Sequence, residues 1–339
     1  MAGTDSTKKK LLYLIDILKE YSDEEHPLSA NDICTMLKED YGVDAERKSI
    51  YTDLNVLQDY GYDIEKVSTP KKGVYLGERE YQVPEVRLLV DAVQAASFIS
   101  PKKTAELTKK ITAVLSENER SLVADKAYKN ERIKTGNETI YYTIDALAKA
   151  IHEKRKVRLH YIRYMTTSGS TPHRVEQIFT LSPYALVWSD DHYYAVCNNA
   201  KYDNFMSVRV DRIKSVDLLM DPIRDCGEFS GYTDGFDVVD YTQKNFNGFS
   251  GETTVVELLC SNDLLQTVID RFGEDVSIRE ADDDKFTVAV TAAISDGFYN
   301  WVSQFDEKML VLTPASVQEE LIRRAESTLA IYRGLTKES

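Results

Sequence analysis

Arginine and tyrosine side chains that could bind an anion concentrate between residues 148 and 220. This segment carries 11 Lys and Arg against 7 Asp and Glu, whereas the whole chain has a net charge of −14. Guanidinium groups match phosphate or carboxylate oxygens, and tyrosine rings offer faces on which a base can stack. These residue types predict a site for a nucleotide or a single-stranded nucleic acid. The candidate ligand-binding residues are Tyr161, Arg163, Arg174, Ser182, Tyr184, Tyr193, Arg209 and Arg212.

Each of these residues also has a structural interpretation. Arg212 could pair with Asp211 or a neighbouring carboxylate, and the aromatic rings could belong to a core. His160 and His173 could join the anion site, but a histidine in a strand is as often structural.

A second group of polar and basic residues lies on one face of a predicted helix over residues 45–60. Ile50, Leu54 and Leu57 recur at the spacing of a buried helical face, so the remaining positions face outward. A recognition helix needs such a face to reach base edges and phosphates. The candidate DNA-binding residues are Arg47, Lys48, Tyr51, Thr52 and Asn55, with Lys71 and Lys72 at the tip of a following hairpin. Residues 1–80 have a net charge of −6, so DNA binding must rely on basic clusters at Lys8–Lys10, Arg47–Lys48 and Lys71–Lys72.

Motifs of the common enzyme classes are missing from the sequence. It has no P-loop, no G-x-S-x-G, no H-E-x-x-H and no glycine-rich dinucleotide turn. The four cysteines form no C-x-x-C pair. Cys197 and His192 lie five residues apart in strand-like sequence and therefore face opposite sides. We expect no enzymatic activity, no metal site and no cofactor.

The first 80 residues predict a winged helix-turn-helix. Helices are expected over 8–21, from a Ser29 cap to Tyr41–Gly42, and over 45–60, followed by strands over 62–67 and 74–76. The alternative is a generic small helical bundle with a hairpin. The stretch Glu46–Leu54, with Leu57 and Gly61–Ile64, resembles the recognition helix and following strand of bacterial regulators that join a DeoR-like winged helix to a WYL domain. Such regulators often carry Arg where this chain has Thr52, so the resemblance implies one weaker DNA contact here.

The middle of the chain changes from helical to strand periodicity. Two helices with proline in the first turn are expected over 84–99 and 101–116, then a polar linker over 125–138 and a helix over 141–154. From Val157 the pattern alternates, and five or six short strands predict a small, strongly bent barrel. The stretches Thr180–Val187, Asp191–Val196 and Ser207–Ile213 resemble, in order and spacing, the WYL domain with its Sm-like barrel. The Trp-Tyr-Leu that names the domain appears here as His192-Tyr193-Tyr194.

The C-terminal part predicts an acidic module with a split βαβ order. Strand, helix, strand, strand, helix and strand follow one another between residues 252 and 312. Residues 221–339 have a net charge of −13, which disfavours nucleic acid binding by this module. Trp301, the strand Met309–Pro314 and the closing helix resemble the C-terminal extension that accompanies WYL domains.

These interpretations combine into a multidomain α+β protein. The expected domains are a winged helix-turn-helix (1–82), a helical linker or dimerisation region (83–138), a WYL ligand-sensing domain with an Sm-like small β-barrel (139–222), a linker (223–250) and a ferredoxin-like C-terminal extension (251–339). The resemblance implies a homodimeric transcription regulator that binds operator DNA. The arginines and tyrosines of residues 148–220 predict that it senses a nucleotide or oligonucleotide, and the polar, lysine-rich residues 1–10 predict a cytoplasmic location. The alternative is an accessory RNA-binding or single-stranded-DNA-binding protein of a phage-defence or CRISPR system.

Overall fold

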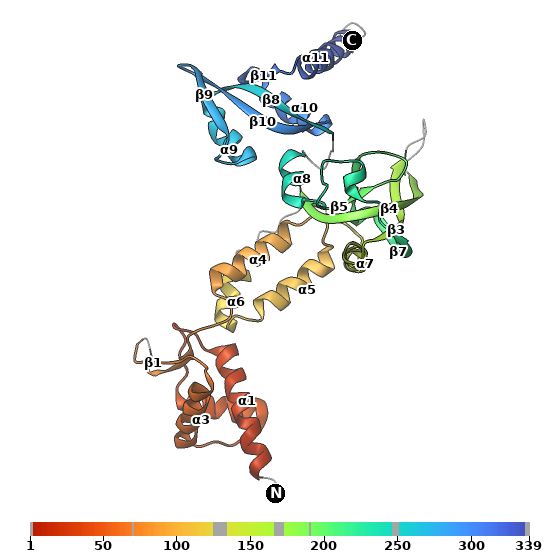
Figure 1. Ribbon diagram of the computed structural model, residues 1–339. Coiled ribbons are helices and arrows are strands. Elements are labelled where there is room, and N and C mark those ends of the chain that lie inside the picture. Colours follow the sequence, from red (N-terminus) through yellow and green to blue (C-terminus); the bar gives the residue numbers. More distant parts are fainter. Residues whose placement is uncertain are drawn as a thin grey trace. The chain divides into compact units, whose positions relative to one another are not determined.

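The computed structural model divides the chain into two compact units, residues 1–136 and 137–339 (Figure 1). It describes residues 3–69, 71–124, 134–165, 173–189, 191–245 and 251–335. Among these residues no helix is long and apolar enough to cross a membrane. Each unit combines helices with antiparallel strands.

The N-terminal module of the first unit contains three helices and a two-stranded hairpin, as the sequence predicts. The elements are α1 (Gly3–Tyr21), α2 (Ala30–Tyr41), α3 (Arg47–Tyr60), β1 (Ile64–Val67) and β2 (Gly73–Leu76). Ser29 caps α2 through a reciprocal pair of hydrogen bonds with Asp32. Gly42 and Gly61 end α2 and α3 with positive φ angles of 66° and 116°, which glycine adopts without strain. One core of leucine, isoleucine and valine side chains joins all five elements.

Three helices, one more than the sequence predicts, complete the first unit. They are α4 (Val83–Ala95), α5 (Pro101–Thr112) and α6 (Glu117–Ala124). The unpredicted α6 begins at a capping box, in which the backbone N–H of Ser116 donates to Glu119 and that of Glu119 donates to Ser116. Val86, Val90, Leu115 and Val123 form the core of this helical segment. Of the expected linker 125–138, residues 125–133 lie outside the described residues.

The second unit opens with α7 (Ile140–His152) and a five-stranded antiparallel sheet. Its strands are β3 (Arg155–Met165), β4 (His173–Ser189), β5 (His192–Asn198), β6 (Phe205–Arg209) and β7 (Ile213–Pro222). The predicted alternation is confirmed, because Val157, Leu159 and Tyr161 are buried. Where short strands are predicted, β4 is one long strand, whose first half pairs with β3 and whose second half pairs with β5.

The barrel expected from these strands is not closed. The strand order is β6-β5-β4-β3-β7, and no ladder joins the edge strands β6 and β7 in the described part of the sheet. A barrel needs its two edges to be hydrogen-bonded, and strand number and spacing in a sequence do not fix that closure.

The expected linker 223–250 is ordered structure over its described part, 223–245. It contains a short 3₁₀ turn (Cys226–Glu228) and α8 (Val238–Lys244). Its aromatic side chains pack with Phe205 and Tyr184 in one hydrophobic cluster: Phe229, Tyr232, Phe236 and Tyr241. Glycines and aspartates between these aromatic residues are typical of a linker, but the rings pack against side chains of the sheet.

A four-stranded antiparallel sheet forms the C-terminal part, and its element order agrees with the predicted split βαβ arrangement. The elements are β8 (Glu252–Ser261), α9 (Leu265–Phe272), β9 (Ser277–Asp282), β10 (Lys285–Ile294), α10 (Asp296–Ser303), β11 (Met309–Thr313) and α11 (Ala315–Leu335). The strand order is β11-β8-β10-β9. One face of the sheet is covered by α9 and α10, with Phe298 fully buried.

Candidate DNA-binding face and candidate anion site

The outward face of α3 carries the five DNA-binding candidates that the sequence places on this helix. Ile50, Leu54 and Leu57 are buried, whereas the candidate side chains are all exposed: Arg47, Lys48, Tyr51, Thr52 and Asn55. The hydroxyl of Thr52 donates to the backbone carbonyl of Lys48 at 3.3 Å. The helix therefore presents a polar, basic stripe to solvent.

A groove with a volume of about 260 Å³ lies where α3, the start of α2 and the hairpin meet. Arg47 and Tyr51 line it from α3, and Lys66 and Lys72 line it from the hairpin. Lys66 is not among the candidates predicted from the sequence, but both Glu65 and Lys66 of β1 are exposed. Arg47, Lys48, Lys66 and Lys72 have no ion pair with a carboxylate in the described part of the chain. These four cations remain available to an anionic partner.

Two other predicted cations of this module are already paired. The ammonium of Lys10 lies 2.7 Å from the carboxylate of Asp53, and both side chains are largely buried. Lys71 at the hairpin tip forms an ion pair with Asp32 on α2. The side chain of Lys8 lies outside the described residues. The basic clusters expected at Lys8–Lys10 and Lys71–Lys72 thus supply fewer free charges than the sequence indicates.

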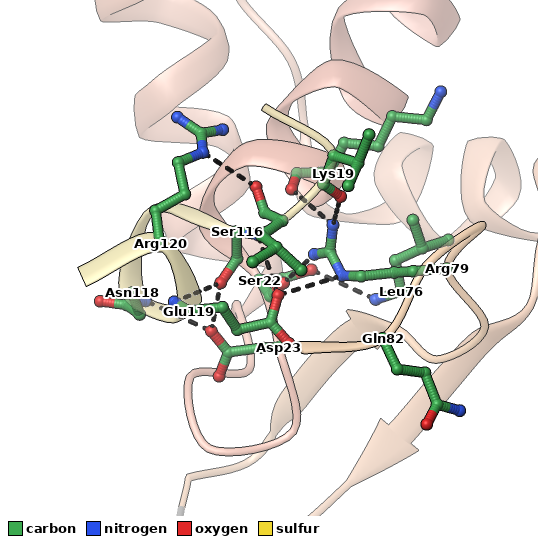
Figure 2. Close-up of polar contacts among 12 residues, drawn as sticks. Lys19, Ser22, Asp23, Leu76, Arg79, Gln82, Ser116, Asn118, Glu119 and Arg120 are labelled. Carbon is green, nitrogen blue, oxygen red and sulfur yellow. Dashed lines mark hydrogen bonds and ion pairs between the residues drawn. The ribbon is translucent and has the colours of Figure 1, made fainter. Parts of the chain in front are cut away.

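Buried polar contacts join the N-terminal module to the helical segment of the same unit (Figure 2). Arg79, whose side chain is 8% exposed, donates to the backbone carbonyls of three residues and lies 3.5 Å from the Glu119 carboxylate. The three carbonyls belong to Lys19, Ser22 and Val114. All three nitrogen atoms of this guanidinium contact a carbonyl or a carboxylate, so Arg79 has a structural role.

Asp23 is the second buried group of this junction. Its carboxylate accepts hydrogen bonds at 2.7 Å from the hydroxyl of Ser116 and from the ring of His26 (Figure 2 shows the Ser116 contact). Burial raises the pKa of Asp23, but the hydrogen bonds from Ser116 and His26 outweigh burial and leave the pKa below its usual value.

In the second unit, Arg209 is paired within its own turn. Its Nε and Nη2 atoms donate to the two carboxylate oxygens of Asp211 at 3.0 and 2.7 Å. Asp211 therefore pairs with Arg209, whereas the sequence suggested Arg212 as its partner. Arg212 is exposed and makes no hydrogen bond or ion pair with another described residue. Burial lowers the pKa of His192, and the charges of Arg209 and Arg212 lower it further, which places these three groups near one another.

The remaining arginines lie at the far end of the β3–β4 hairpin. Arg174 is exposed, donates to the hydroxyl of Tyr164 at 3.1 Å and covers its ring. Arg163 is exposed on the same face of β3 as Tyr161. Tyr161 is 8% exposed and packs edge-on against Phe179, and Tyr193 is half-buried. Of the aromatic candidates, Tyr161 and Tyr193 are therefore only partly accessible.

Ser182 and Tyr184 are used to hold the segment that follows β7. The Ser182 hydroxyl accepts from the backbone N–H of Arg224 at 3.0 Å, and the Tyr184 hydroxyl donates to the Arg224 carbonyl at 2.8 Å. The Tyr184 ring packs against Phe205, Phe229 and Phe236. Burial raises the pKa of Tyr184 above its usual value. Neither residue offers a free surface for a base.

Aromatic and polar side chains line a pocket of about 230 Å³ on the β4–β6 half of the sheet. Trp188, Tyr194, Ser207 and Arg271 are among its lining residues, and none of the eight predicted ligand-binding residues is. Tyr194 lies directly opposite Arg209 in the β5–β6 ladder. The described residues include no group of three or more His, Cys, Asp and Glu side chains that could hold a metal ion.

Comparison with known proteins identifies two domains in the second unit. Residues 142–218 match the model of the WYL domain, and residues 252–329 match that of the WCX domain. A solved structure of proteasome accessory factor B/C (PafBC) of Arthrobacter aurescens has 16% sequence identity and a TM-score of 0.28, over 96% of this chain and 49% of that chain. The chain thus spans about half the length of that relative. No curated protein sequence matches this chain. The WYL resemblance is confirmed over residues 142–218, and a match to the WCX domain follows it along the chain.

Proposed function

We propose that the protein is a ligand-responsive transcription regulator. The N-terminal module acts as a winged helix-turn-helix, with α3 as the recognition helix and the β1–β2 hairpin as the wing. The observation that carries this proposal is the α3 face with its groove, where Arg47, Lys66 and Lys72 have no carboxylate partner among the described residues. Unpaired cations around an exposed helix are what duplex DNA binding requires. The protein acts in the cytoplasm, where its operator DNA is accessible.

The WYL domain is the proposed sensor. An anionic ligand, a nucleotide or a short oligonucleotide, binds near the turn that carries Arg209 and Arg212. Support comes from the exposed guanidinium of Arg212 and from the net positive charge of residues 148–220 in an acidic chain. Ligand and operator DNA then change each other's affinity by the same factor.

We propose that the chain has no enzymatic activity of its own. Burial raises the pKa of the Cys197 thiol to about 12, which disfavours the thiolate that a nucleophile needs. His192 lies an odd number of residues away on β5, on the opposite face of the strand.

The regulator functions as a homodimer, because one recognition helix reads only a half-site. Light scattering of the full chain should give twice the 38.6 kDa mass of one chain. A mass of one chain, with and without DNA, contradicts the dimer.

Selection from a pool of random DNA duplexes, followed by footprinting, tests the proposed function. The full chain should enrich a pseudo-palindromic duplex and protect two half-sites. A protein with Arg47 and Lys48 replaced by Ala should enrich none. Lys109→Ala removes an exposed charge on α5, outside the N-terminal module, and should behave like the parent.

The accessory-protein alternative predicts another outcome of the same selection. The charge of the WYL domain is the observation that favours it, because that charge could bind RNA or single-stranded DNA without any promoter. Binding to single strands with no enrichment of a duplex would support this alternative and contradict the regulator.

A further inference from the structure

The peptide that connects the two units is anchored within the first unit by Lys134 and Thr135. The ammonium of Lys134 donates to the carbonyl of Ala96 at 2.8 Å and to that of Val93 at 3.4 Å. The backbone N–H of Thr135 donates to the carbonyl of Ser97 at 2.8 Å. Lys134 therefore supplies a positive charge at the C-terminal end of α4, where the helix dipole favours it.

Within the second unit, the same peptide is anchored by Asn137. The Nδ2 atom of Asn137 donates to the carbonyls of Asp211 and Ile213 at 3.0 and 3.1 Å. Its Oδ1 atom accepts from the backbone N–H and the hydroxyl of Thr139 at 2.9 and 2.7 Å. Because both amide donors and the amide oxygen are in use, the side chain cannot turn over without losing all four bonds.

The two carbonyls that Asn137 holds flank Arg212, in the turn that also carries Arg209 and Asp211. Any movement of this turn changes the position of those carbonyls and so acts on Asn137. Gly136, between the two anchors, is exposed, and a Cβ atom there would meet nothing within 4 Å. One exposed glycine thus separates an anchor in the first unit from an anchor in the second.

We propose that Asn137 is a positioning residue that transmits movement of the Arg209–Arg212 turn to the connecting peptide, with Gly136 as the pivot. A ligand that engages Arg212, or that separates Arg209 from Asp211, acts on the first unit through this side chain. The link to ligand and DNA rests on the function proposed above. The mechanical link between the turn and residues 134–137 does not.

A purely structural role for Asn137 has a different consequence. If the amide serves only to begin α7 through Thr139, a change in the turn leaves the connecting peptide unaffected. The two roles use different atoms of the side chain, since Oδ1 binds Thr139 and Nδ2 binds the turn. Variants can therefore separate them.

Hydrogen exchange of the full-length protein, measured by mass spectrometry over residues 134–140, tests the proposal without ligand or DNA. The parent, Asp211→Asn, Asn137→Ala and the double variant form a cycle, in which Asp211→Asn weakens the hold on Arg209. Asp211→Asn should speed exchange in the parent and have little further effect when Asn137 is Ala. The effect of Asp211→Asn on the exchange rate should differ between the two backgrounds by about 2-fold or more, which is the smallest coupling expected for residues in one hydrogen-bond network.

Two further variants assign the effect to the amide donors. Asn137→Asp keeps an oxygen for Thr139 but loses both donors, and should abolish the coupling as Asn137→Ala does. Thr139→Val removes one donor to Oδ1, leaves the bonds to the turn and should preserve the coupling. The proposal would be overturned if Asp211→Asn changed exchange equally in the parent and in Asn137→Ala, or changed it in neither. It would also be overturned if Thr139→Val abolished the coupling. None of these outcomes depends on whether the protein binds an operator.

Discussion

The α3 face and the Arg209–Arg212 turn both look like cation sites in the sequence, but the fold treats their charges differently. On α3, Arg47 and Lys48 are exposed and form no ion pair within the described ranges of the chain, and the hairpin adds Lys66 and Lys72 beside Arg47. In the turn, Arg209 is bound through two hydrogen bonds to Asp211, and Arg212 remains exposed. The comparison teaches that an arginine in a candidate site serves binding only if the fold leaves its guanidinium free.

Arg79 is the extreme case of a paired arginine, and its replacement should have the largest effect on stability. Arg79→Met keeps the aliphatic stem but leaves three carbonyls and Glu119 without their donor. We expect a loss of about 3 kcal/mol in the free energy of unfolding, typical of removing one partner from a buried charged group. Urea unfolding measures it. Arg87→Met on α4, where the arginine is more exposed, is the control and should cost little.

The Arg209–Asp211 pair should contribute less. Asp211→Asn keeps the side-chain shape but removes the negative charge and one of the two acceptor oxygens that hold Arg209, whose side chain is 23% exposed. We expect a cost of about 2 kcal/mol, as for hydrogen bonds to a charged group. The corresponding change on α3, Arg47→Ala, should leave the unfolding free energy within about 0.5 kcal/mol. Equal costs at the two sites would break the comparison.

The carboxylate of Asp23 should make the free energy of unfolding depend on pH in the acidic range. Because the pKa of Asp23 in the folded protein lies below its usual value of 3.8, its hydrogen bonds stabilise the fold above that pH. This contribution should disappear as the pH falls below 3.8 and through the folded-state pKa. Asp23→Asn should flatten this part of the stability curve, measured by urea unfolding at a series of pH values. An unchanged curve would show that Asp23 is not the titrating group.

The smallest expected effect is on ligand binding and separates the two arginines of the turn. Arg212→Ala should weaken binding of a short thymidine oligonucleotide more than Arg209→Ala does, because Asp211 occupies the guanidinium of Arg209. A lost charge-assisted hydrogen bond corresponds to about 10-fold in affinity. Fluorescence anisotropy with a labelled oligonucleotide measures the difference. Stronger dependence on Arg209 would mean that the ligand displaces Asp211.

Helical periodicity made the α3 face predictable, because Ile50, Leu54 and Leu57 fix which side of the helix is buried. The sheet residues were harder to assign. Ser182 and Tyr184 bind the backbone of Arg224, which lies 42 and 40 residues away, and no local pattern reveals such a partner. The packing of residues 223–245 could not be predicted for the same reason, since their partners on the sheet are distant in sequence and their aromatic residues follow no regular spacing. The open edges of the sheet also depend on pairing that strand patterns do not specify.

The most direct test of the central claim is the salt dependence of duplex DNA binding by the full chain. The affinity of the parent and of the Arg47→Ala, Lys72→Ala double variant is measured from low to physiological salt on the duplex obtained by selection. Each cation that contacts a phosphate adds about 0.9 to the slope of log affinity against log salt, so the double variant should lose a slope of about 2. Lys109→Ala should keep the parental slope. A double variant with the affinity and slope of the parent would contradict DNA binding through the α3 face.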